Sequence, residues 1–437
     1  MNFSAEALVE ILAGWPHPRR YVALVSGGLD STVLLHALAE VRLRLVAPVV
    51  VLHFDHGIAA DSPLWARQVE RLAETLGLPF FLERLAIASG AALETRARSA
   101  RYARLSAWMR PDDCCLTAHH ADDQAETFLL QGLRGAGPAG LAGMPGLRRF
   151  GSGWLGRPLL VWTRSQLASR ARMQSIEWIE DPGNLDPAAP RNWLRQRVWP
   201  SLTDRWPAAS ITLARSASQA AEAAALAAEW AEEDLARHAG SSADRLPVAA
   251  LLGLGHARRR NLLRHWIRKR ELSVPTAAKL LELERELIER DPGARATLTW
   301  PGAEAHRFRG MLHILAPLPH PSSAAIVLTP GEWSDLGPLG RVALIADPRG
   351  QLGPIVMKGV LTLRFRVGGE TLRPAGHAHH RPLKKLLQEF AVLPWMRPRV
   401  PLLYAGDQLI AVTGLSVAAE YAGQGWALLW ENAPSLR

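Results

Sequence analysis

The residues Leu24-Val25-Ser26-Gly27-Gly28-Leu29-Asp30-Ser31-Thr32 interrupt an apolar run with a small polar turn, and Val33-Leu34-Leu35 resumes the run. This pattern predicts a strand, a tight loop and a helix. Gly27 and Gly28 have no Cβ, so their backbone can adopt positive φ and turn its N–H groups toward an anion. The following helix directs the positive end of its dipole at the same place. We therefore expect a polyphosphate ligand, bound by Ser26, Gly27, Gly28, Leu29, Asp30, Ser31 and Thr32.

Asp30 indicates which phosphate compound this loop binds. A carboxylate would repel the ligand by about a kcal/mol or more unless a cation, normally Mg²⁺, lay between them. We therefore expect a magnesium nucleotide, with Asp30 as the metal ligand. The loop is not a Walker A motif, because no Gly-Lys pair occurs in the chain, and it lacks the GxGxxG spacing of dinucleotide folds. An ordinary Gly-Ser turn between a core strand and a helix is the structural alternative.

The composition points to a large protein with a polyanionic partner. A length of 437 residues suggests about three domains. The net charge is +10 and comes almost entirely from arginine, which grips phosphates and stacks on bases as RNA binding requires. A GC-rich genome also replaces lysine with arginine without functional meaning, so both explanations stay open.

The cysteines and the apolar runs indicate a cytoplasmic protein. Cys114 and Cys115 are adjacent, which excludes a disulfide framework and favours a reducing compartment. The N-terminal residues 1–15 are typical of an amphipathic helix rather than a signal peptide. The longest apolar runs, such as residues 45–52, are too short to span a bilayer, so no membrane partner is expected.

Residues 21–199 alternate short β-branched runs with helical patterns, which predicts an α/β domain with a doubly wound parallel sheet. The expected strands are residues 22–25, 47–54, 80–85 and 115–118, and the expected helices are 32–39, 65–76, 93–108 and 124–131. Ligands of such sheets lie beyond the carboxyl ends of the strands.

Two polar clusters follow strand ends and should therefore lie beside the loop. One contains His53 and Asp55, and the other contains His119, Asp122 and Asp123. The acids of the second cluster could hold a metal or orient a reacting group. Two alternatives are a zinc site, for which the usual ligand spacing is missing, and helix capping beside core histidines.

The motifs SGGLDST, HFDHG, AHHADDQAETFLL, GRPLL, EDPGN and RNWLR follow one another in one order. Together they resemble the bacterial tRNA(Ile)-lysidine synthetase family, within the ATP-pyrophosphatase (PP-loop) superfamily. The resemblance covers nearly the whole chain. The chain departs from the family at Asp55, where histidine or asparagine is frequent, and at Gly183, where serine is usual.

The resemblance implies a ligase that forms a carbon–nitrogen bond. ATP would adenylate the C2 oxygen of the wobble cytidine in the CAU-anticodon tRNA(Ile), and the ε-amine of free L-lysine would displace AMP to give lysidine, which changes the codon read from AUG to AUA. The implied cofactors are ATP and Mg²⁺, and a homodimer is a further candidate. The implied catalytic residues are Asp30, Asp122, Asp123 and Arg101, and His53, Asp55 and His119 complete the nucleotide site.

The whole chain divides into three predicted domains, at residues 1–205, 206–320 and 340–437. An alanine-rich long helix is expected over residues 210–239, followed by a helical middle domain and a small α+β domain. Basic residues in all three predicted domains favour contact with RNA, and a solvated basic surface is the alternative. The candidates for RNA binding are Arg191, Arg195, Arg259, Arg264, Arg366, Arg381, Lys384, Lys385 and Arg397.

Three other functions share part of this pattern. A tRNA thiolase would need a reactive cysteine, whereas Cys114 and Cys115 fall in or next to a predicted strand. A small-molecule amide synthetase would not need the basic C-terminal half. An ATP-regulated RNA-binding module without catalysis would not need the paired acids.

Overall fold

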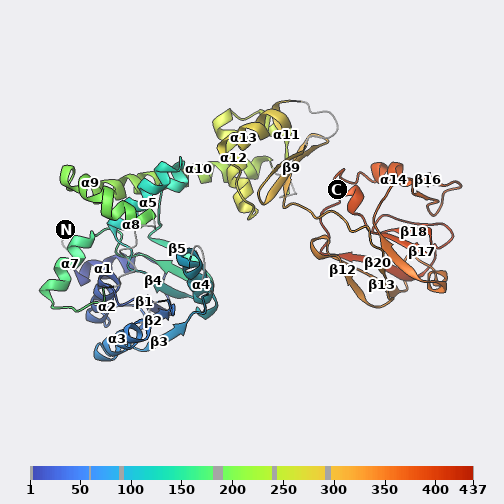
Figure 1. Ribbon diagram of the computed structural model, residues 1–437. Helices are drawn as coiled ribbons and strands as arrows, with labels where there is room; N and C mark the ends of the chain where they lie inside the picture. The colour runs from blue at the N-terminus through green and yellow to red at the C-terminus, as the bar shows by residue number, and fades with distance from the viewer. Residues whose placement is uncertain are drawn as a thin grey trace. The chain divides into compact units, whose positions relative to one another are not determined.

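The computed structural model describes residues 3–58, 61–87, 93–180, 190–238, 244–290 and 297–436. The chain forms two compact units, Met1–Ala227 and Ala228–Arg437 (Figure 1). The motif EDPGN lies partly outside the described residues, as does the end of the predicted helix at residue 239.

The first unit contains a six-stranded sheet with the order β3-β2-β1-β4-β6-β5. Neighbouring strands are parallel except β5, which is antiparallel to β6. The predicted parallel sheet is confirmed. The hairpin of β5 and β6 was not predicted, because its residues LRRF and GWLG are short and poor in β-branched side chains. The strands are β1 (Arg20–Leu24), β2 (Val49–Asp55), β3 (Phe80–Arg84), β4 (Asp113–Leu116), β5 (Leu147–Phe150) and β6 (Gly153–Gly156).

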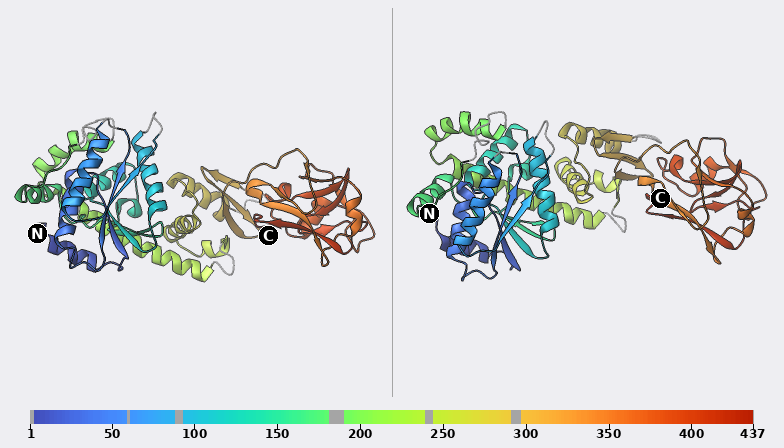
Figure 2. Two further views of the ribbon diagram at one scale, coloured as in Figure 1. Left: turned by 90° about the horizontal axis from the view of Figure 1, so that it is seen from below. Right: turned by 60° about the horizontal axis from the view of Figure 1, so that its bottom comes forward.

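Helices cover both faces of this sheet, as Figure 2 shows. Tyr21 and Ala23 point to one face of β1 and Val22 points to the other, since successive strand residues alternate. The first face packs against α1 (Ala5–Ala13), α2 (Leu29–Glu40), α3 (Ser62–Thr75) and α7 (Arg164–Met173), and the second packs against α4 (Leu93–Trp108). The sheet is therefore doubly wound, as predicted.

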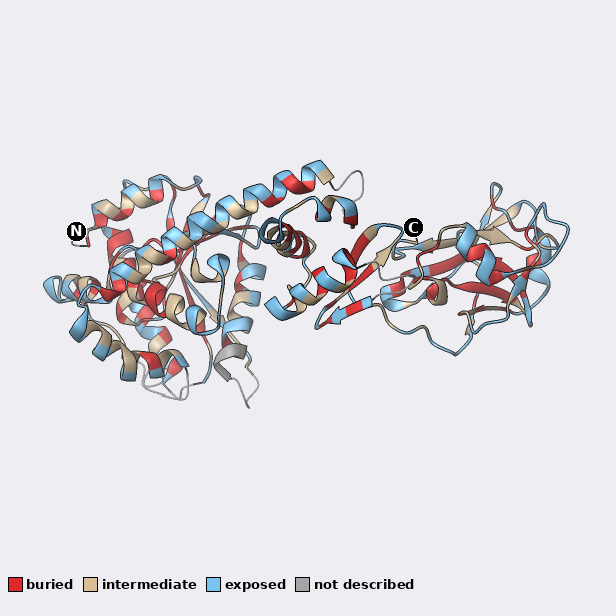
Figure 3. Cartoon of the chain, turned by 90° about the horizontal axis from the view of Figure 1, so that it is seen from above, coloured by how far each residue is buried: buried red, intermediate tan, exposed pale blue. Residues whose placement is uncertain are grey.

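The helix α5 (Ala121–Leu133) follows β4, and the short α6 (Pro138–Leu141) comes next. Three short helical segments come later in the first unit, namely α8 (Pro190–Trp193), the π-helical turn η2 (Leu194–Val198) and α9 (Trp199–Arg205). The predicted long helix is α10 (Ala209–His238), with 30 residues. Figure 3 shows that most of its surface is exposed.

The second unit begins with a helical region joined to an antiparallel sheet. The helices predicted over residues 246–289 are present as α11 (Val248–Leu252), α12 (His256–Lys269), α13 (Ala277–Leu283) and the π-helical turn η3 (Glu284–Glu289). The sheet β7-β10-β9-β8 was not predicted, because strand residues such as AEAHRF carry polar side chains that resemble a loop. Its strands are β7 (Arg245–Pro247), β8 (Thr297–Trp300), β9 (Ala303–Phe308) and β10 (Met311–Leu315).

The C-terminal part has the predicted α+β character. Its sheets have the orders β11-β14-β17-β18-β19, β12-β13-β20 and β15-β16, and α14 (Leu383–Glu389) packs beside them. The strands β11 and β12 precede residue 340, and the domain boundaries themselves stay predictions. The strands are β11 (Ile326–Val327), β12 (Trp333–Asp335), β13 (Arg341–Asp347), β14 (Leu361–Arg364), β15 (Thr371–Leu372), β16 (Arg381–Pro382), β17 (Leu402–Ala405), β18 (Gln408–Val412), β19 (Ser416–Val417) and β20 (Gly425–Glu431).

Candidate active site

The glycine loop has the predicted strand-turn-helix form. β1 ends at Leu24 and α2 begins at Leu29, with Gly28 as its N-cap. Gly27 has φ of +91°, in the region that side chains disfavour, and a Cβ there would lie 2.4 Å from Cδ1 of Ile179. The N–H of Ile179 donates to the Gly27 carbonyl at 2.9 Å. Both the backbone angle and this close contact require glycine at position 27.

The hydroxyl groups of the loop hold its shape. Thr32 Oγ1 donates to the Gly27 carbonyl at 3.1 Å, and Ser31 Oγ donates to the Gly28 carbonyl at 3.0 Å. Ser31 Oγ also accepts from the Ser26 N–H at 3.2 Å. Thr32 is buried and its proton is used inside the loop, which gives its hydroxyl a structural role. The predicted ligand contacts of the loop residues stay predictions.

Two cavities within the first unit are lined by Ser26 of the loop. A cavity of about 580 Å³ is lined by the loop and by residues of other elements, including Asp30, Arg101, Tyr102, Thr117, His119 and Arg164. A second cavity of about 390 Å³ shares Leu24, Ser26 and Arg101 with the first and is lined by His53, Asp55, His56 and Trp65. The fold thus brings together every residue expected at the nucleotide site except Gly27 and Thr32, which lie behind the loop beside a smaller cavity.

Asp30 has the environment of a cation ligand. Its Oδ1 is buried and accepts no hydrogen bond within the described part of the chain. Its Oδ2 lies 3.7 Å from His120 Nε2 and 4.0 Å from Arg164 Nε. Burial raises the pKa of Asp30, and the charges of His120 and Arg164 offset this only in part. A cation bound at Oδ1 would pair the free oxygen and stabilise the charged form, so the residue fits the predicted metal.

The first turn of α5 gathers acids around one imidazole. His120 caps the helix, since its N–H donates to Asp123 Oδ2 and its Nδ1 accepts from the Asp123 N–H. Its ring nitrogens lie 3.7, 3.4 and 3.5 Å from carboxylate oxygens of Asp30, Asp122 and Asp123. Burial lowers the pKa of His120, but these carboxylates outweigh burial and the net pKa is raised. The three carboxylates thus favour the charged form of the ring.

Asp122 is engaged by protein donors on both oxygens. Its Oδ2 accepts from the Arg164 N–H at 2.7 Å and its Oδ1 accepts from Ser210 Oγ at 2.6 Å. Burial alone would raise the pKa of Asp122, yet the hydrogen bonds lower it to about 2. These bonds favour a positioning role for Asp122, and its predicted contact with the metal or the substrate stays a prediction.

Asp123 belongs to a buried ion-pair network that reaches η2. Arg195 places Nη2 2.6 Å from Asp123 Oδ1 and Nε 2.5 Å from Glu126 Oε1. Arg191 donates to Thr127 Oγ1 at 2.6 Å and lies 3.2 Å from Glu126 Oε2. The charges of both arginines are thus compensated by α5, so the RNA binding predicted for them would compete with these pairs.

Glu126 was missed by the sequence analysis, although it is only 1% exposed and central to the network. The available signal was its spacing, since residues three apart lie on the same helix face.

His119 belongs to the cavity wall, where its Nδ1 lies 2.9 Å from Thr117 Oγ1 and burial lowers its pKa to about 4. Within the described ranges, no group of three potential metal ligands with close spacing occurs at this site, which does not support the zinc alternative.

The basic residues predicted to bind RNA in the second unit differ in exposure. Arg259 is buried and donates to the Leu251 and Leu254 carbonyls and to Glu289, which does not favour RNA contact, and its predicted role stays a prediction. Burial lowers the pKa of Arg264, whose neighbours are Arg260 and Arg268. Lys384 and Lys385 are exposed. The remaining candidates have protein partners: Arg366 with Glu370, Arg381 with Glu389, and Arg397 with the Val392 carbonyl.

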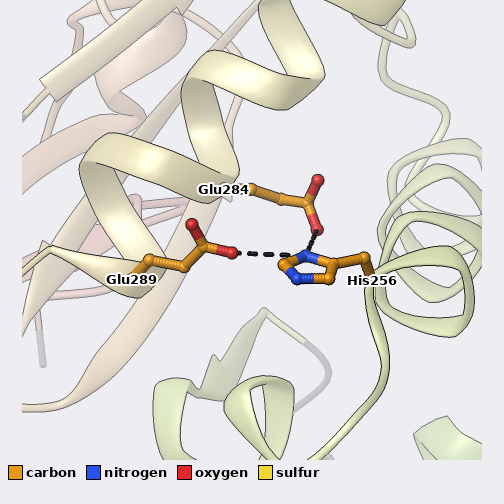
Figure 4. Close-up of side chains that lie close together, drawn as sticks. All are labelled: His256, Glu284 and Glu289. Atoms are coloured by element: carbon orange, nitrogen blue, oxygen red, sulfur yellow. Dashed lines mark ion pairs between the residues drawn. The ribbon is translucent and has the colours of Figure 1, made fainter.

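His256, Glu284 and Glu289 converge where α12 meets η3 (Figure 4). His256 Nδ1 lies 3.4 Å from Glu289 Oε1 and 3.9 Å from Glu284 Oε1. Arg259 Nη1 lies 2.8 Å from the same Glu289 oxygen, and Arg260 Nη1 lies 3.2 Å from Glu284 Oε2. Because two guanidinium groups already compensate the two carboxylates, we interpret the cluster as an ion-pair junction.

Comparisons with known proteins cover nearly the whole chain. A family model described as a PP-loop domain matches residues 3–202, the TilS substrate binding domain matches 246–313, and the TilS substrate C-terminal domain matches 361–430. The tRNA(Ile)-lysidine synthase of Alkalilimnicola ehrlichii is 39% identical over 442 residues, which cover 99% of this chain and 98% of the relative. The chain belongs to the tRNA(Ile)-lysidine synthase family. The family's member in Pseudomonas fluorescens is 38% identical over 436 residues, covering 97% of this chain and 96% of its own.

Membership of the tRNA(Ile)-lysidine synthase family confirms the resemblance and the prediction of a ligase with an ATP-binding PP-loop domain. The departure at Asp55 has a local explanation. Its Oδ1 accepts from the Gly57 N–H at 2.9 Å, and this bond, with one from Ser62, overcomes the effect of burial and lowers the pKa of Asp55. The carboxylate thus caps the turn after β2.

The cysteines have no features of a tRNA thiolase. Cys114 and Cys115 are both buried in β4, on opposite faces of the sheet. Burial raises the pKa of the Cys114 thiol to about 12 and that of Cys115 well above its usual range. Neither forms a thiolate readily. Among the described helices, none combines the length and the apolar character needed to cross a membrane.

Proposed function

We propose that the chain joins free L-lysine to C2 of the wobble cytidine in the CAU-anticodon tRNA(Ile), with conversion of ATP to AMP and pyrophosphate. One observation carries this proposal within the family assignment. Asp30 lines the cavity beside the PP-loop, and its buried Oδ1 accepts no hydrogen bond among the described residues. That arrangement suits a magnesium nucleotide and not a loop with a purely structural role.

The first step is adenylation of the base. The C2 oxygen of cytidine attacks the α-phosphorus of ATP, and the bond to the β-phosphate oxygen breaks to release pyrophosphate. Backbone N–H groups of the loop and the positive end of α2 stabilise the leaving charge. Mg²⁺ held by Asp30 would supply further charge neutralisation when bound. Arg101 lines both cavities and would contact the phosphates.

The second step replaces AMP by lysine. The ε-amine attacks C2, the bond from C2 to its adenylated oxygen breaks, and AMP leaves with that oxygen while the amine gives up a proton. A primary ammonium needs a nearby carboxylate to bind, and Asp123 of the network is the candidate.

The experiment is a single assay with purified protein, Mg-ATP, radiolabelled lysine and a tRNA(Ile) transcript. Label should enter the RNA only when ATP is present and the wobble base is cytidine, and a transcript with uridine there is the matched control. Labelling of the uridine transcript, or AMP formation without labelled RNA, would contradict the proposal. The cytoplasm, as the location of tRNA, is the proposed compartment. Sedimentation of the free protein would test the predicted homodimer.

A further inference from the structure

The first turn of α10 is hydrogen-bonded to the first turn of α5. Ser210 Oγ donates to Asp122 Oδ1 at 2.6 Å, across 88 residues of sequence. Ser210 is 6% exposed, on a helix whose surface is otherwise mostly accessible. A short hydrogen bond to a carboxylate is among the stronger polar contacts in proteins, so it fixes the point at which α10 leaves the catalytic domain.

The other oxygen of the same carboxylate holds the start of α7. Asp122 Oδ2 accepts from the backbone N–H of Arg164, the first residue of that helix. The Arg164 side chain lines the nucleotide cavity, with Nε 4.0 Å from Asp30 Oδ2. This guanidinium is 62% exposed, so it has room to move toward a ligand. One carboxylate therefore connects the base of α10 to a cation that faces the PP-loop.

We propose that Arg164 binds the phosphates of ATP and that Ser210 and Asp122 are positioning residues, which hold Arg164 in place through the start of α7. This inference depends on the proposed function, since it assigns parts of the same nucleotide site. The inference predicts that Ser210 and Arg164 are energetically coupled, so that their substitutions do not have independent effects on ATP binding. Loss of the Ser210 hydroxyl loosens Asp122, and the Arg164 backbone then loses its fixed acceptor.

A double-mutant cycle on the full-length protein tests the coupling, with the KM for ATP measured in tRNA-dependent ATP–pyrophosphate exchange. Arg164→Ala should raise this KM roughly tenfold, because a charge-assisted contact to phosphate is lost. Ser210→Ala should raise it roughly threefold. In the Arg164→Ala background, Ser210→Ala should add no further change, because its effect passes through Arg164.

Matched variants separate positioning from general stability. Ser210→Thr keeps a hydroxyl and should have the KM for ATP of the unaltered protein. Ser210→Cys keeps the size of the side chain but should raise this KM as Ser210→Ala does. It replaces the alanine variant if that variant fails to fold. Ser216→Ala, on an exposed part of the same helix where the hydroxyl bonds only to Thr212, should leave the KM unchanged. A KM unchanged in Ser210→Ala and Ser210→Cys, or effects that multiply in the double mutant, would overturn the inference. Absence of exchange in the unaltered protein would instead contradict the proposed function.

Discussion

The guanidinium of Arg195 lies 2.6 Å from Oδ1 of Asp123, which joins η2 to the first turn of α5. Arg195→Ala should destabilise the protein by about 2 kcal/mol, because it leaves Asp123 and the buried Glu126 without their main cation. The cost is below that of a fully buried pair, since Arg195 is 37% exposed. Urea denaturation measures the change. The control is the double variant Arg195→Ala, Glu126→Gln. It should recover part of the lost stability, because it removes the carboxylate that has lost its cation. A stable variant with a weaker salt dependence of tRNA binding would instead support the predicted contact of Arg195 with RNA.

Asp30→Ala should abolish tRNA-dependent ATP–pyrophosphate exchange while tRNA binding stays nearly intact. The variant removes the carboxylate whose buried Oδ1 accepts no hydrogen bond among the described residues, and with it the proposed metal ligand. Exchange and a filter-binding assay with tRNA give the two readouts. Glu6→Ala, a change of the same charge at an exposed residue of α1, is the matched control. Persistent exchange would show that Asp30 does not hold the metal.

Gly27→Ala should cost about 2 to 3 kcal/mol of stability. The new Cβ would meet Ile179 at 2.4 Å and the residue would be held at φ of +91°. Gly77→Ala separates these effects, because Gly77 also has positive φ but no atom within 4 Å of the added Cβ. That variant should lose only about 1 kcal/mol. Equal losses in both variants, measured by thermal or chemical unfolding, would show that the Ile179 contact does not matter.

Asp122 should contribute to stability at neutral pH and lose that contribution in acid. Its pKa is lowered from 3.8 in the unfolded chain to about 2 in the folded protein. A group with a depressed folded pKa stabilises the fold above its unfolded pKa, and the effect disappears as the pH falls from about 4 to 2. The difference corresponds to about 2 kcal/mol. Unfolding free energies of the protein and of Asp122→Asn should therefore converge as the pH approaches 2. A constant difference between the two unfolding free energies across this pH range would show that the pKa of Asp122 is not lowered.

Replacement of Cys114 and Cys115 by alanine should leave lysine incorporation largely unchanged. Both thiols are buried and their pKa values are raised, so neither can act as a nucleophile. A thiol reagent should react with the native protein only after denaturation. Loss of the reaction in a variant that melts normally would revive the thiolase hypothesis.

Local patterns in the sequence predicted the sheet and the loop well, because a glycine turn between an apolar strand and a helix is specified by neighbouring residues. The small sheet β7-β10-β9-β8 was not predicted, since its strands mix Glu, His and Arg with apolar residues and depend on pairing partners far along the chain. Arg259 shows a similar limit. A basic residue on an amphipathic helix usually faces water, whereas this one is buried against backbone carbonyls and Glu289.

The roles of Ser210, Arg164 and Glu126 come from tertiary contacts. Ser210 and Arg164 meet Asp122 across 88 and 42 residues, and Glu126 meets Arg195 across 69 residues. Sequence spacing predicted that Asp30, His119 and Asp123 would lie near the loop, since they follow the carboxyl ends of parallel strands. It could not show that Asp122 accepts from Arg164 and Ser210 whereas Asp123 pairs with Arg195.

The 30 residues of α10 make it a lever arm about 45 Å long at the usual rise per residue. A tilt of roughly 5° about the turn that holds Ser210 would displace the last turn of the helix by about 4 Å, which is longer than a covalent bond. A small change in the hydrogen bond between Ser210 and Asp122 would therefore be amplified along the helix.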